Sequence, residues 1–179
     1  TTYTYDGLGN LARLASPDTG IATYVPDAAG NVVGATDARG MATSYVYDTL
    51  NRQTLATFAG GSVAFEYDSA ATGGAFASGR LTRVTDPSGS TTYAYDAWGR
   101  VLRKTQAVGS DASSRSFAVS YQHAAGRMTG ITYPSGRVLS YASDAQGRVT
   151  GVAIGGQMVL SGATYLPFGA VLGWTWANG

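Results

Sequence analysis

Hydrophobic and polar residues alternate over short stretches that recur along the whole chain. In the stretch "YAYDAWGRVLRKT", residues 93–105, two tyrosines stand two residues apart. Side chains with this spacing lie on one face of a β-strand, so Tyr93 and Tyr95 predict a strand with an aromatic face. A polar segment at 96–99 interrupts the pattern, and residues 101–105 predict a returning strand. Helical periodicity never holds for three turns anywhere in the chain.

The interruption has the residues of a tight turn. An Asp at the first position of a type I turn accepts hydrogen bonds from amides two and three residues further on, which is the role expected of Asp96. Gly99 is suited to the positive φ that closes such a turn with a bulge. Arg100 is expected to lie across from Asp96. A second turn, "DPSG" at 86–89, places Pro and Gly where type I turns prefer them, and "DARG" at 37–40 and "YPSG" at 133–136 are expected to do the same.

This hairpin unit is repeated through the chain. Its turn glycine, or a substitute, falls at Gly9, Gly30, Asn51, Gly79, Gly99, Gly126, Gly147 and Gly169. Five of the seven intervals are 20 to 22 residues long, and the other two are 28 and 27. The additional residues, in "YDSAATGGAFASGRL" and "TQAVGSDASSRS", are small and polar. We expect them in loops, because an odd insertion in a strand would move every later side chain to the other face.

The repeat predicts the fold. One hairpin is too small to be stable alone, so the copies are expected to pair edge to edge. The predicted fold class is all-β: tandem β-hairpins, about 15 antiparallel strands, in one sheet about 70 Å long that curves or spirals. Residues 1–179 are expected to form a single array of about eight repeats of about 21 residues, with no separate catalytic domain.

Composition and charge exclude several classes of function. Gly contributes 25 residues and Tyr 12, a balance that disfavours long helices and favours strands. Cysteine is absent, which excludes disulfides and thiolate metal sites. The net charge is +1, without the concentrated basic surface that nucleic-acid binding requires. No apolar run approaches the roughly 18 residues of a membrane span, and no targeting signal is recognised. We therefore expect no nucleic-acid partner and no membrane span.

The turn aspartates allow two interpretations. A column of carboxylates could bind Ca²⁺, or each carboxylate could cap its own turn. Equivalent aspartates in successive hairpins would lie about 10 Å apart, whereas Ca²⁺ needs six to eight oxygens at about 2.3–2.6 Å. We therefore predict a structural role and no metal or other cofactor. The predicted structural turn residues are Asp6, Gly9, Asp27, Gly30, Asp48, Asn51, Asp68, Gly79, Asp96, Gly99, Gly126, Asp144 and Gly147.

No catalytic or cofactor-binding residue is predicted. The single histidine, His123, is expected in an exposed turn within "YQHAAGR", with Gln122 in the place of the usual Asp. A catalytic histidine needs an oriented nucleophile, and no Gly-x-Ser-x-Gly motif occurs. The glycine-rich stretches "ATGGAFASGR" and "GGQ" lack the Gly-Lys-Ser/Thr of a phosphate-binding loop and open no helix, so they are expected to be loops.

The aromatic residues also have two interpretations. The paired tyrosines are expected to form ladders across the sheet, which would contribute about 0.2–1 kcal/mol per cross-strand pair. Alternatively, the aromatic stripe could bind sugar rings or an extended polypeptide. We favour packing, because the tyrosines are part of the repeat itself. The candidate contact surface consists of Tyr93, Tyr95, Trp98, Trp174 and Trp176.

The octet Tyr-x-Tyr-Asp-x-x-Gly-Arg, with a second turn of Asp-Pro-x-Gly type, resembles the Rhs or YD repeat. The octet is clearest in "YTYDGLGN" (3–10), "YVYDTLNR" (45–52) and "YAYDAWGR" (93–100). Partial copies occur at 24–31, 65–68, 121–127 and 141–148. The tail "YLPFGAVLGWTWANG" looks like a degenerate copy, with Phe168 and Gly169 where the aspartate turn should be.

The resemblance implies a container. Rhs proteins, cocoon subunits of insecticidal toxin complexes, wall-associated toxins and teneurins build a spiralling β-shell from such repeats, and the bacterial shells resemble a capsule around a C-terminal toxin domain. The chain is then expected to be a fragment of such a shell, secreted or at the cell surface, and not an enzyme. The implied partner is a toxin or effector domain elsewhere in the same polypeptide, with secretion-apparatus proteins or surface glycans as further candidates. The alternative is a cell-surface adhesion module that binds carbohydrate through its aromatic ladder.

Overall fold

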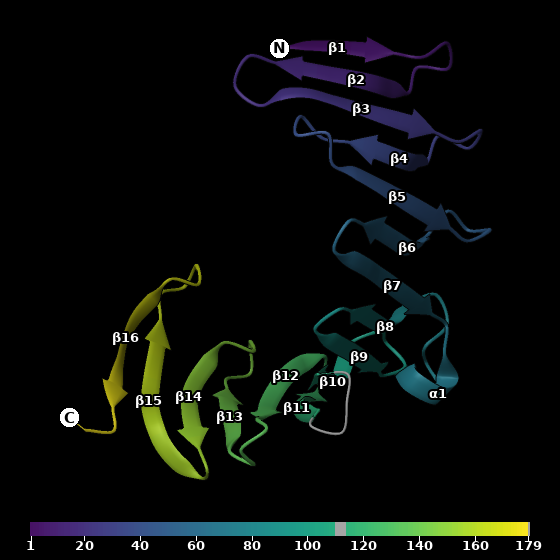
Figure 1. Ribbon diagram of the computed structural model, residues 1–179. Coiled ribbons are helices and arrows are strands. Elements are labelled where there is room, and N and C mark those ends of the chain that lie inside the picture. The colour runs from purple at the N-terminus through teal and green to yellow at the C-terminus, as the bar shows by residue number, and fades with distance from the viewer. Residues whose placement is uncertain (110–113, 179) are drawn as a thin grey trace.

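The computed structural model describes residues 1–109 and 114–178 (Figure 1). They form 16 β-strands and one short helix, and all the strands belong to a single sheet. The order of strands in the sheet is their order in the sequence, and every neighbouring pair is antiparallel. The structure confirms the predicted all-β fold of tandem hairpins in one antiparallel sheet.

The elements alternate with tight turns along the chain. They are β1 (Thr2–Tyr5), β2 (Leu11–Ser16), β3 (Gly20–Pro26), β4 (Val32–Thr36), β5 (Ala42–Tyr47), β6 (Gln53–Phe58), β7 (Gly61–Tyr67), α1 (Ala70–Gly73), β8 (Leu81–Asp86), β9 (Gly89–Tyr95), β10 (Val101–Val108), β11 (Arg115–Ala124), β12 (Arg127–Thr132), β13 (Val138–Ser143), β14 (Val149–Ile154), β15 (Gln157–Tyr165) and β16 (Val171–Trp176). Among the described residues, no helix is long and apolar enough to cross a membrane.

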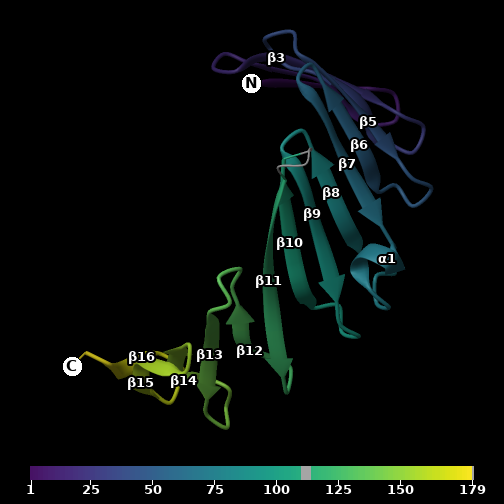
Figure 2. The ribbon, with the colours of Figure 1, turned by 60° about the horizontal axis from the view of Figure 1, so that its bottom comes forward.

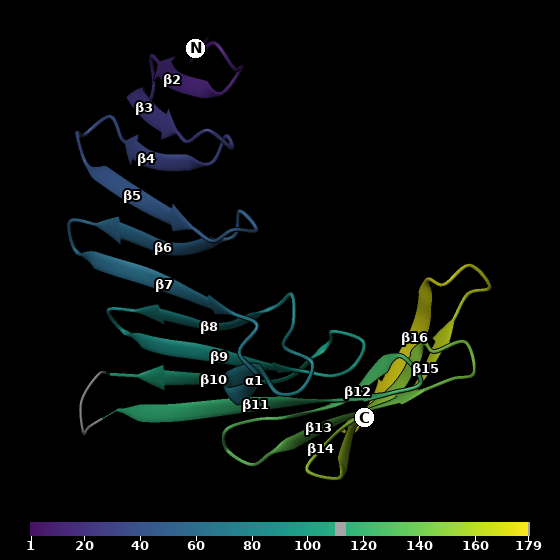
Figure 3. The same cartoon turned by 90° about the vertical axis from the view of Figure 1, so that its right-hand side faces the viewer.

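The sheet is long and curved. In Figure 1, β1 to β9 follow one another down the right-hand side, and β13 to β16 lie on the left beyond a bend. Figure 2 shows β8 to β11 side by side and the C-terminal strands almost edge-on, and Figure 3 shows the N-terminal strands in succession with the C-terminal hairpins turning away. Each motif hairpin has a register shift beside its turn, for example between Val46 and Tyr47. Such bulges bend and twist a strand, so they account for part of the curvature.

The sheet is a single layer with little buried interior. The buried hydrophobic residues in the described chain are all alanines: Ala56, Ala77, Ala153 and Ala163. One face, the tyrosine face, carries the motif tyrosines and aliphatic residues; Tyr45, for example, pairs with Ala56, which pairs with Val63. Ser and Thr recur on the opposite face, the hydroxyl face, where Thr92 pairs with Thr105. Neither face is packed against a second sheet, so most side chains remain partly accessible.

The insertion of the fourth copy was expected to be a loop without helix, and this is wrong. Residues 70–73 form α1, which packs against β8 and β9. Small side chains make this close approach possible, because a Cβ added to Gly73 would lie 2.5 Å from Thr82 Cγ2. Thr82 is fully buried, and its hydroxyl donates a hydrogen bond to the Glu66 carbonyl over 2.9 Å. The insertion therefore covers part of the sheet.

The second set of extra residues lengthens two strands. In place of the expected loop, β10 and β11 extend to 8 and 10 residues and stay paired as far as Val108 and Arg115. Both strands grow together, so the two faces keep their identity. The remainder of the expected loop, residues 110–113, lies outside the described residues.

The second turns were expected to be alike, and this is wrong. Asp86 pairs directly with Gly89, which leaves a two-residue connection. The turn that begins at Asp37 instead follows the motif pattern, because the Asp37 N–H donates to the Met41 carbonyl over 3.0 Å. The turn at Tyr133 has the same backbone contacts. The proline in "DPSG" alone does not distinguish the two forms, since "YPSG" carries it too.

Candidate functional site: the clasp between repeats

The motif turn is held by its aspartate. Asp96 Oδ1 accepts hydrogen bonds from the backbone N–H groups of Trp98 and Arg100, each over 2.9 Å. The backbone closes the same turn, because the Gly99 N–H donates to the Asp96 carbonyl over 3.0 Å. The carboxylate thus satisfies amides that the sheet cannot reach. The same pair of carboxylate contacts recurs at Asp6, Asp27, Asp37 and Asp48.

The turn glycines and Asn51 have positive φ. Their φ values lie between 58° and 93° at Gly9, Gly30, Asn51, Gly79, Gly99, Gly126, Gly147 and Gly169. In the fourth copy, Asp68 Oδ1 accepts from the Gly79 N–H over 2.5 Å, across the whole insertion. In the last copy Leu166 occupies the aspartate position, and its N–H donates to the Ala170 carbonyl over 2.8 Å. The backbone turn therefore forms there without a carboxylate.

The residue after the turn glycine pairs with the turn aspartate. Arg100 Nε lies 2.7 Å from Asp96 Oδ2, and Arg148 Nε lies 2.8 Å from Asp144 Oδ2. In the first two copies an asparagine amide makes the equivalent contact, over 2.9 Å at Asp6 and 3.0 Å at Asp27. These donors, together with the turn amides, favour the ionised carboxylate and hold the pKa of the turn aspartates below its usual value; at Asp6 the largest cause is the Asn10 side chain.

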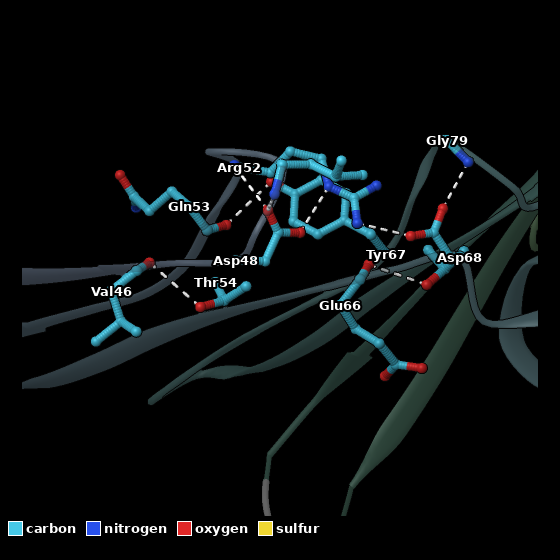
Figure 4. A network of polar contacts seen from close by, with 11 residues as sticks. Val46, Asp48, Arg52, Gln53, Thr54, Glu66, Tyr67, Asp68 and Gly79 are labelled. Carbon is cyan, nitrogen blue, oxygen red and sulfur yellow. Dashed lines mark hydrogen bonds and ion pairs between the residues drawn. The ribbon is translucent and has the colours of Figure 1, made fainter. Parts of the chain in front are cut away.

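The arginine also reaches into the next hairpin, as Figure 4 shows for Arg52. Its Nε binds Asp48 of its own turn over 2.7 Å, and its Nη2 binds Asp68 of the next turn over 2.6 Å. The guanidinium lies 4.4 Å from the centroid of the Tyr67 ring. The Tyr67 hydroxyl donates back to the Gln53 carbonyl over 3.0 Å. We call this arrangement of arginine, tyrosine ring and carbonyl the clasp, because it joins two consecutive hairpins.

Parts of the clasp recur along the sheet. The arginine lies over the next tyrosine ring in the pairs Arg80–Tyr95 at 5.7 Å and Arg148–Tyr165 at 4.8 Å. The tyrosine hydroxyl donates to a backbone carbonyl in the pairs Tyr47–Val32, Tyr95–Leu81 and Tyr165–Val149, over 2.9, 2.5 and 2.6 Å. In each case the acceptor directly follows the Arg or Asn position of the preceding hairpin. An exposed cation–π contact contributes about 0.5–1 kcal/mol and a hydrogen bond about 0.5–1.5 kcal/mol, so several clasps add substantially to a single-layer sheet.

The predicted ladder of tyrosines packed on one another is wrong. The cross-strand partners of Tyr45 and Tyr93 are Ala56 and Lys104. Only alternate strands carry the motif tyrosines, so two of them on one row are about 10 Å apart. Within the described residues the one aromatic pair in contact is Trp174 with Trp176, at 6.0 Å between ring centroids and an interplanar angle of 89°. The tyrosines contact arginines and carbonyls instead.

The candidate contact residues do not form one surface. Trp98 is 78% exposed in its turn, whereas Tyr93 and Tyr95 are half-buried in β9 and the Tyr95 hydroxyl is already hydrogen bonded. Trp174 and Trp176 lie on β16, about half exposed, beside an apolar pocket of about 190 Å³. No contact joins β9 and β16. The structure therefore places the two groups of aromatic residues apart.

His123 does not occupy an exposed turn, contrary to the expectation. It lies in β11, is half-buried, and pairs with Met128. The turn is the two-residue segment Ala125–Gly126, in which both residues have positive φ. The turn of this copy is one residue shorter than the turns of the others. His123 therefore lies in the strand, two residues after Tyr121, at the position of the second motif tyrosine. Gln122 is therefore not the substitute for the aspartate.

The carboxylates of the described residues do not gather into a metal site. No three His, Cys, Asp or Glu side chains in residues 1–109 and 114–178 are placed to share an ion. The turn aspartates are instead occupied by turn amides and by Arg or Asn side chains.

Antiparallel hairpins repeated in tandem and joined at their turns define the chain as a β-hairpin repeat protein. The RHS Repeat family model matches residues 27–63 and 77–111, and the other copies have the same hairpin. The match identifies the hairpins in these two segments as RHS repeats. No curated protein sequence matches the chain.

The fold is shared with solved structures. The crystal structures of TcdB2-TccC3 and TcdB2-TccC3-Cdc42 each match with a TM-score of 0.83, and that of TcdB2-TccC3-TEV with 0.81. Sequence identity is 19% in each case, and the matches cover 98% of this chain. The chain spans about a tenth of the length of those chains, since 10% of each is covered.

Proposed function

We propose that the chain is a structural segment of a β-shell that encloses or presents a toxin or effector domain of the same polypeptide. The observation that carries this proposal is the clasp in a single-layer sheet. Consecutive hairpins are fastened to each other, while no second layer packs on them. A continuous hydrogen-bonded sheet of this kind is suited to separate two volumes. The RHS-repeat match and the fold shared with TcdB2-TccC3 support the proposal.

The proposed mechanism is containment. The whole of residues 1–179 acts as one array of repeats with no separate catalytic domain, and the segment is not an enzyme. Its two surfaces, the tyrosine face and the hydroxyl face, hold cargo by shape and by weak amphipathic contact. The shell is secreted or displayed at the cell surface, where it contacts secretion-apparatus proteins or surface glycans. Delivery to another cell requires that the wall stay closed until release.

The test uses the full-length protein. We expect a cargo domain to co-purify with it and to resist a protease that degrades the same domain when expressed alone. The double substitution Arg52→Gln and Tyr67→Phe removes one clasp and is expected to speed digestion of the cargo. Leu50→Ala, at an exposed turn position of the same hairpin, is the control and is expected to leave protection unchanged. A cargo that is digested equally fast in the intact protein would refute the proposal, as would turnover of a defined substrate by the isolated segment.

A second candidate function is carbohydrate binding at a cell surface. The observation that favours it is the exposed pair Trp174 and Trp176 beside the apolar pocket on β16. Aromatic rings that are half exposed are suited to stack against sugars. Binding on a glycan array that is lost in Trp174→Ala and kept in Phe168→Ala, where the side chain is fully exposed, would favour adhesion. An array without specific binding would exclude this function for the segment.

A further inference from the structure

One copy of the repeat lacks the tyrosine that its neighbours use for the clasp. In the motif hairpins, the second aromatic residue pairs with the residue that follows the arginine, as Tyr95 pairs with Val101. His123 pairs with Met128, the residue after Arg127, so it stands at the tyrosine position. An imidazole is shorter than a phenol and has no hydroxyl. His123 therefore cannot fill the space that a tyrosine takes in the other copies.

A pocket lies where the tyrosine ring would be. It has a volume of about 260 Å³ and is lined by Trp98, Arg100, His123, Ala124, Ala125 and Gly126. Arg100 is the arginine that would cover the ring. Its guanidinium lies instead 4.8 Å from the centroid of the Trp98 ring in its own turn. The pocket is thus bordered by a cation, an exposed indole and an imidazole.

His123 has an unsatisfied polar atom in this place. Its Nδ1 is buried and has no hydrogen-bond partner among the residues that the structure describes. A buried polar group without a partner is unfavourable, and an imidazole nitrogen can either donate or accept. A rotation of the imidazole ring by a half-turn about χ2 exchanges the positions of Nδ1 and Cδ2. A phenol hydroxyl that donates to a backbone carbonyl still has lone pairs, with which it can accept from an imidazole N–H.

We propose that this pocket binds the phenol of a tyrosine from a partner polypeptide. The ring enters between Arg100 and His123, and its hydroxyl is directed to the carbonyl of Val101, the residue that follows Arg100. The protein itself contains the template for this complex. An arginine covers a tyrosine ring in three other copies, Arg52–Tyr67, Arg80–Tyr95 and Arg148–Tyr165, and each of those hydroxyls donates to the carbonyl after the arginine.

The proposal is independent of whether the chain forms a shell. A tyrosine is favoured over an anion, because the side chain of Arg100 is already paired with Asp96 over 2.7 Å. A tyrosine is also favoured over an aliphatic side chain, because a cation over the ring and an acceptor beyond it select an aromatic ring with a hydroxyl. Trp98 is 78% exposed at the mouth of the pocket and is available to contact the same ring.

The test uses p-cresol as the tyrosine side chain and the 179-residue protein. His123 is the single histidine, so labelling histidine with ¹⁵N gives one imidazole to follow by NMR. We expect a saturable shift of that signal with p-cresol at constant pH, and about fivefold weaker binding of toluene, which lacks the hydroxyl. A shift that does not saturate would overturn the proposal. Equal binding of toluene would also overturn it, by showing a merely apolar pocket.

Variants locate the binding site. In His123→Tyr the chain supplies its own phenol, so saturation-transfer NMR is expected to show that p-cresol binding is lost. Trp98→Ala changes an exposed side chain and is expected to weaken p-cresol binding about fivefold while the fold is kept. Trp176→Ala, on β16, is the matched control and is expected to bind normally. Unchanged binding in Trp98→Ala would refute the proposed site, even if His123→Tyr failed to fold.

Discussion

Removing one hydroxyl from the clasp should loosen two hairpins by a measurable amount. In Tyr67→Phe the ring stays beneath Arg52, but the hydrogen bond to the Gln53 carbonyl, 3.0 Å long, is lost. A partly buried hydrogen bond contributes about 0.5–1.5 kcal/mol, and the carbonyl left without a partner adds to the loss. We therefore expect the free energy of unfolding to fall by about 1–2 kcal/mol. For a chain of this length, each 1 kcal/mol lowers the melting temperature by about 2–4 °C.

The assay combines thermal unfolding, followed by circular dichroism, with hydrogen exchange of individual amides. Each hairpin contacts only its neighbours, so faster exchange is expected first in β6 and β7. Tyr5→Phe is the matched control, because Tyr5 is 58% exposed on β1 and its hydroxyl has no partner in the described chain. We expect this variant to change stability by less than about 0.5 kcal/mol. Equal losses in the two variants, or exchange that rises uniformly along the sheet, would refute the role assigned to the hydroxyl.

Three further predictions follow from the same contacts. Gly99 and Gly9 both have positive φ, but a Cβ on Gly99 would lie 2.6 Å from Arg80 Nη2, whereas a Cβ on Gly9 would meet nothing within 4 Å. In urea unfolding, Gly99→Ala should therefore destabilise the protein by about 1 kcal/mol more than Gly9→Ala. Equal losses of stability in the two variants would contradict this. Folding lowers the pKa of the turn carboxyls, and at Asp48 the largest cause is the hydrogen bond from the backbone N–H of Arg52. The ionised carboxyls therefore stabilise the folded state at pH values above their ordinary pKa of 3.8, and this stabilisation is lost as the pH falls below it. The urea midpoint should then stay constant from pH 7 to about 5 and drop below pH 4, less steeply in Asp48→Asn, and a drop centred near pH 6 would contradict this interpretation. His123→Tyr should restore a clasp and raise the melting temperature by about 2–4 °C, and a lower melting temperature in a folded variant would show that the site is not built for tyrosine.

The hairpins and their order could be predicted because the signals that form them are local. Asp96 and Gly99 stand three residues apart and determine one turn, and the alternation around Tyr93 and Tyr95 determines one strand. Tandem repetition then leaves few ways to pair the units. A sheet in which strand order equals sequence order needs no long-range information.

The clasp could not be predicted from the same signals. Its partners, such as Gln53 and Tyr67, are 14 residues apart and belong to different strands, so neither the turn nor the strand pattern relates them. The sequence does contain a spacing that relates the partners of the clasp. In four places, a motif tyrosine follows 14 to 16 residues after the residue whose carbonyl accepts its hydroxyl, and that residue comes directly after the Arg or Asn position. The position of His123 was missed for a different reason. The loss of one residue from that turn moved the histidine from the expected turn into the strand.

The dependence of each hairpin on its immediate neighbours bears on how such a chain changes over generations. A duplication or deletion of one complete unit leaves the surviving joints built from the same two positions, the Arg or Asn position of one hairpin and the second aromatic position of the next. Gene segments can therefore be gained or lost in whole multiples without redesign of the remainder. Extra residues short of a complete unit are accommodated at a turn, as α1 illustrates, or by lengthening two paired strands together, as in β10 and β11.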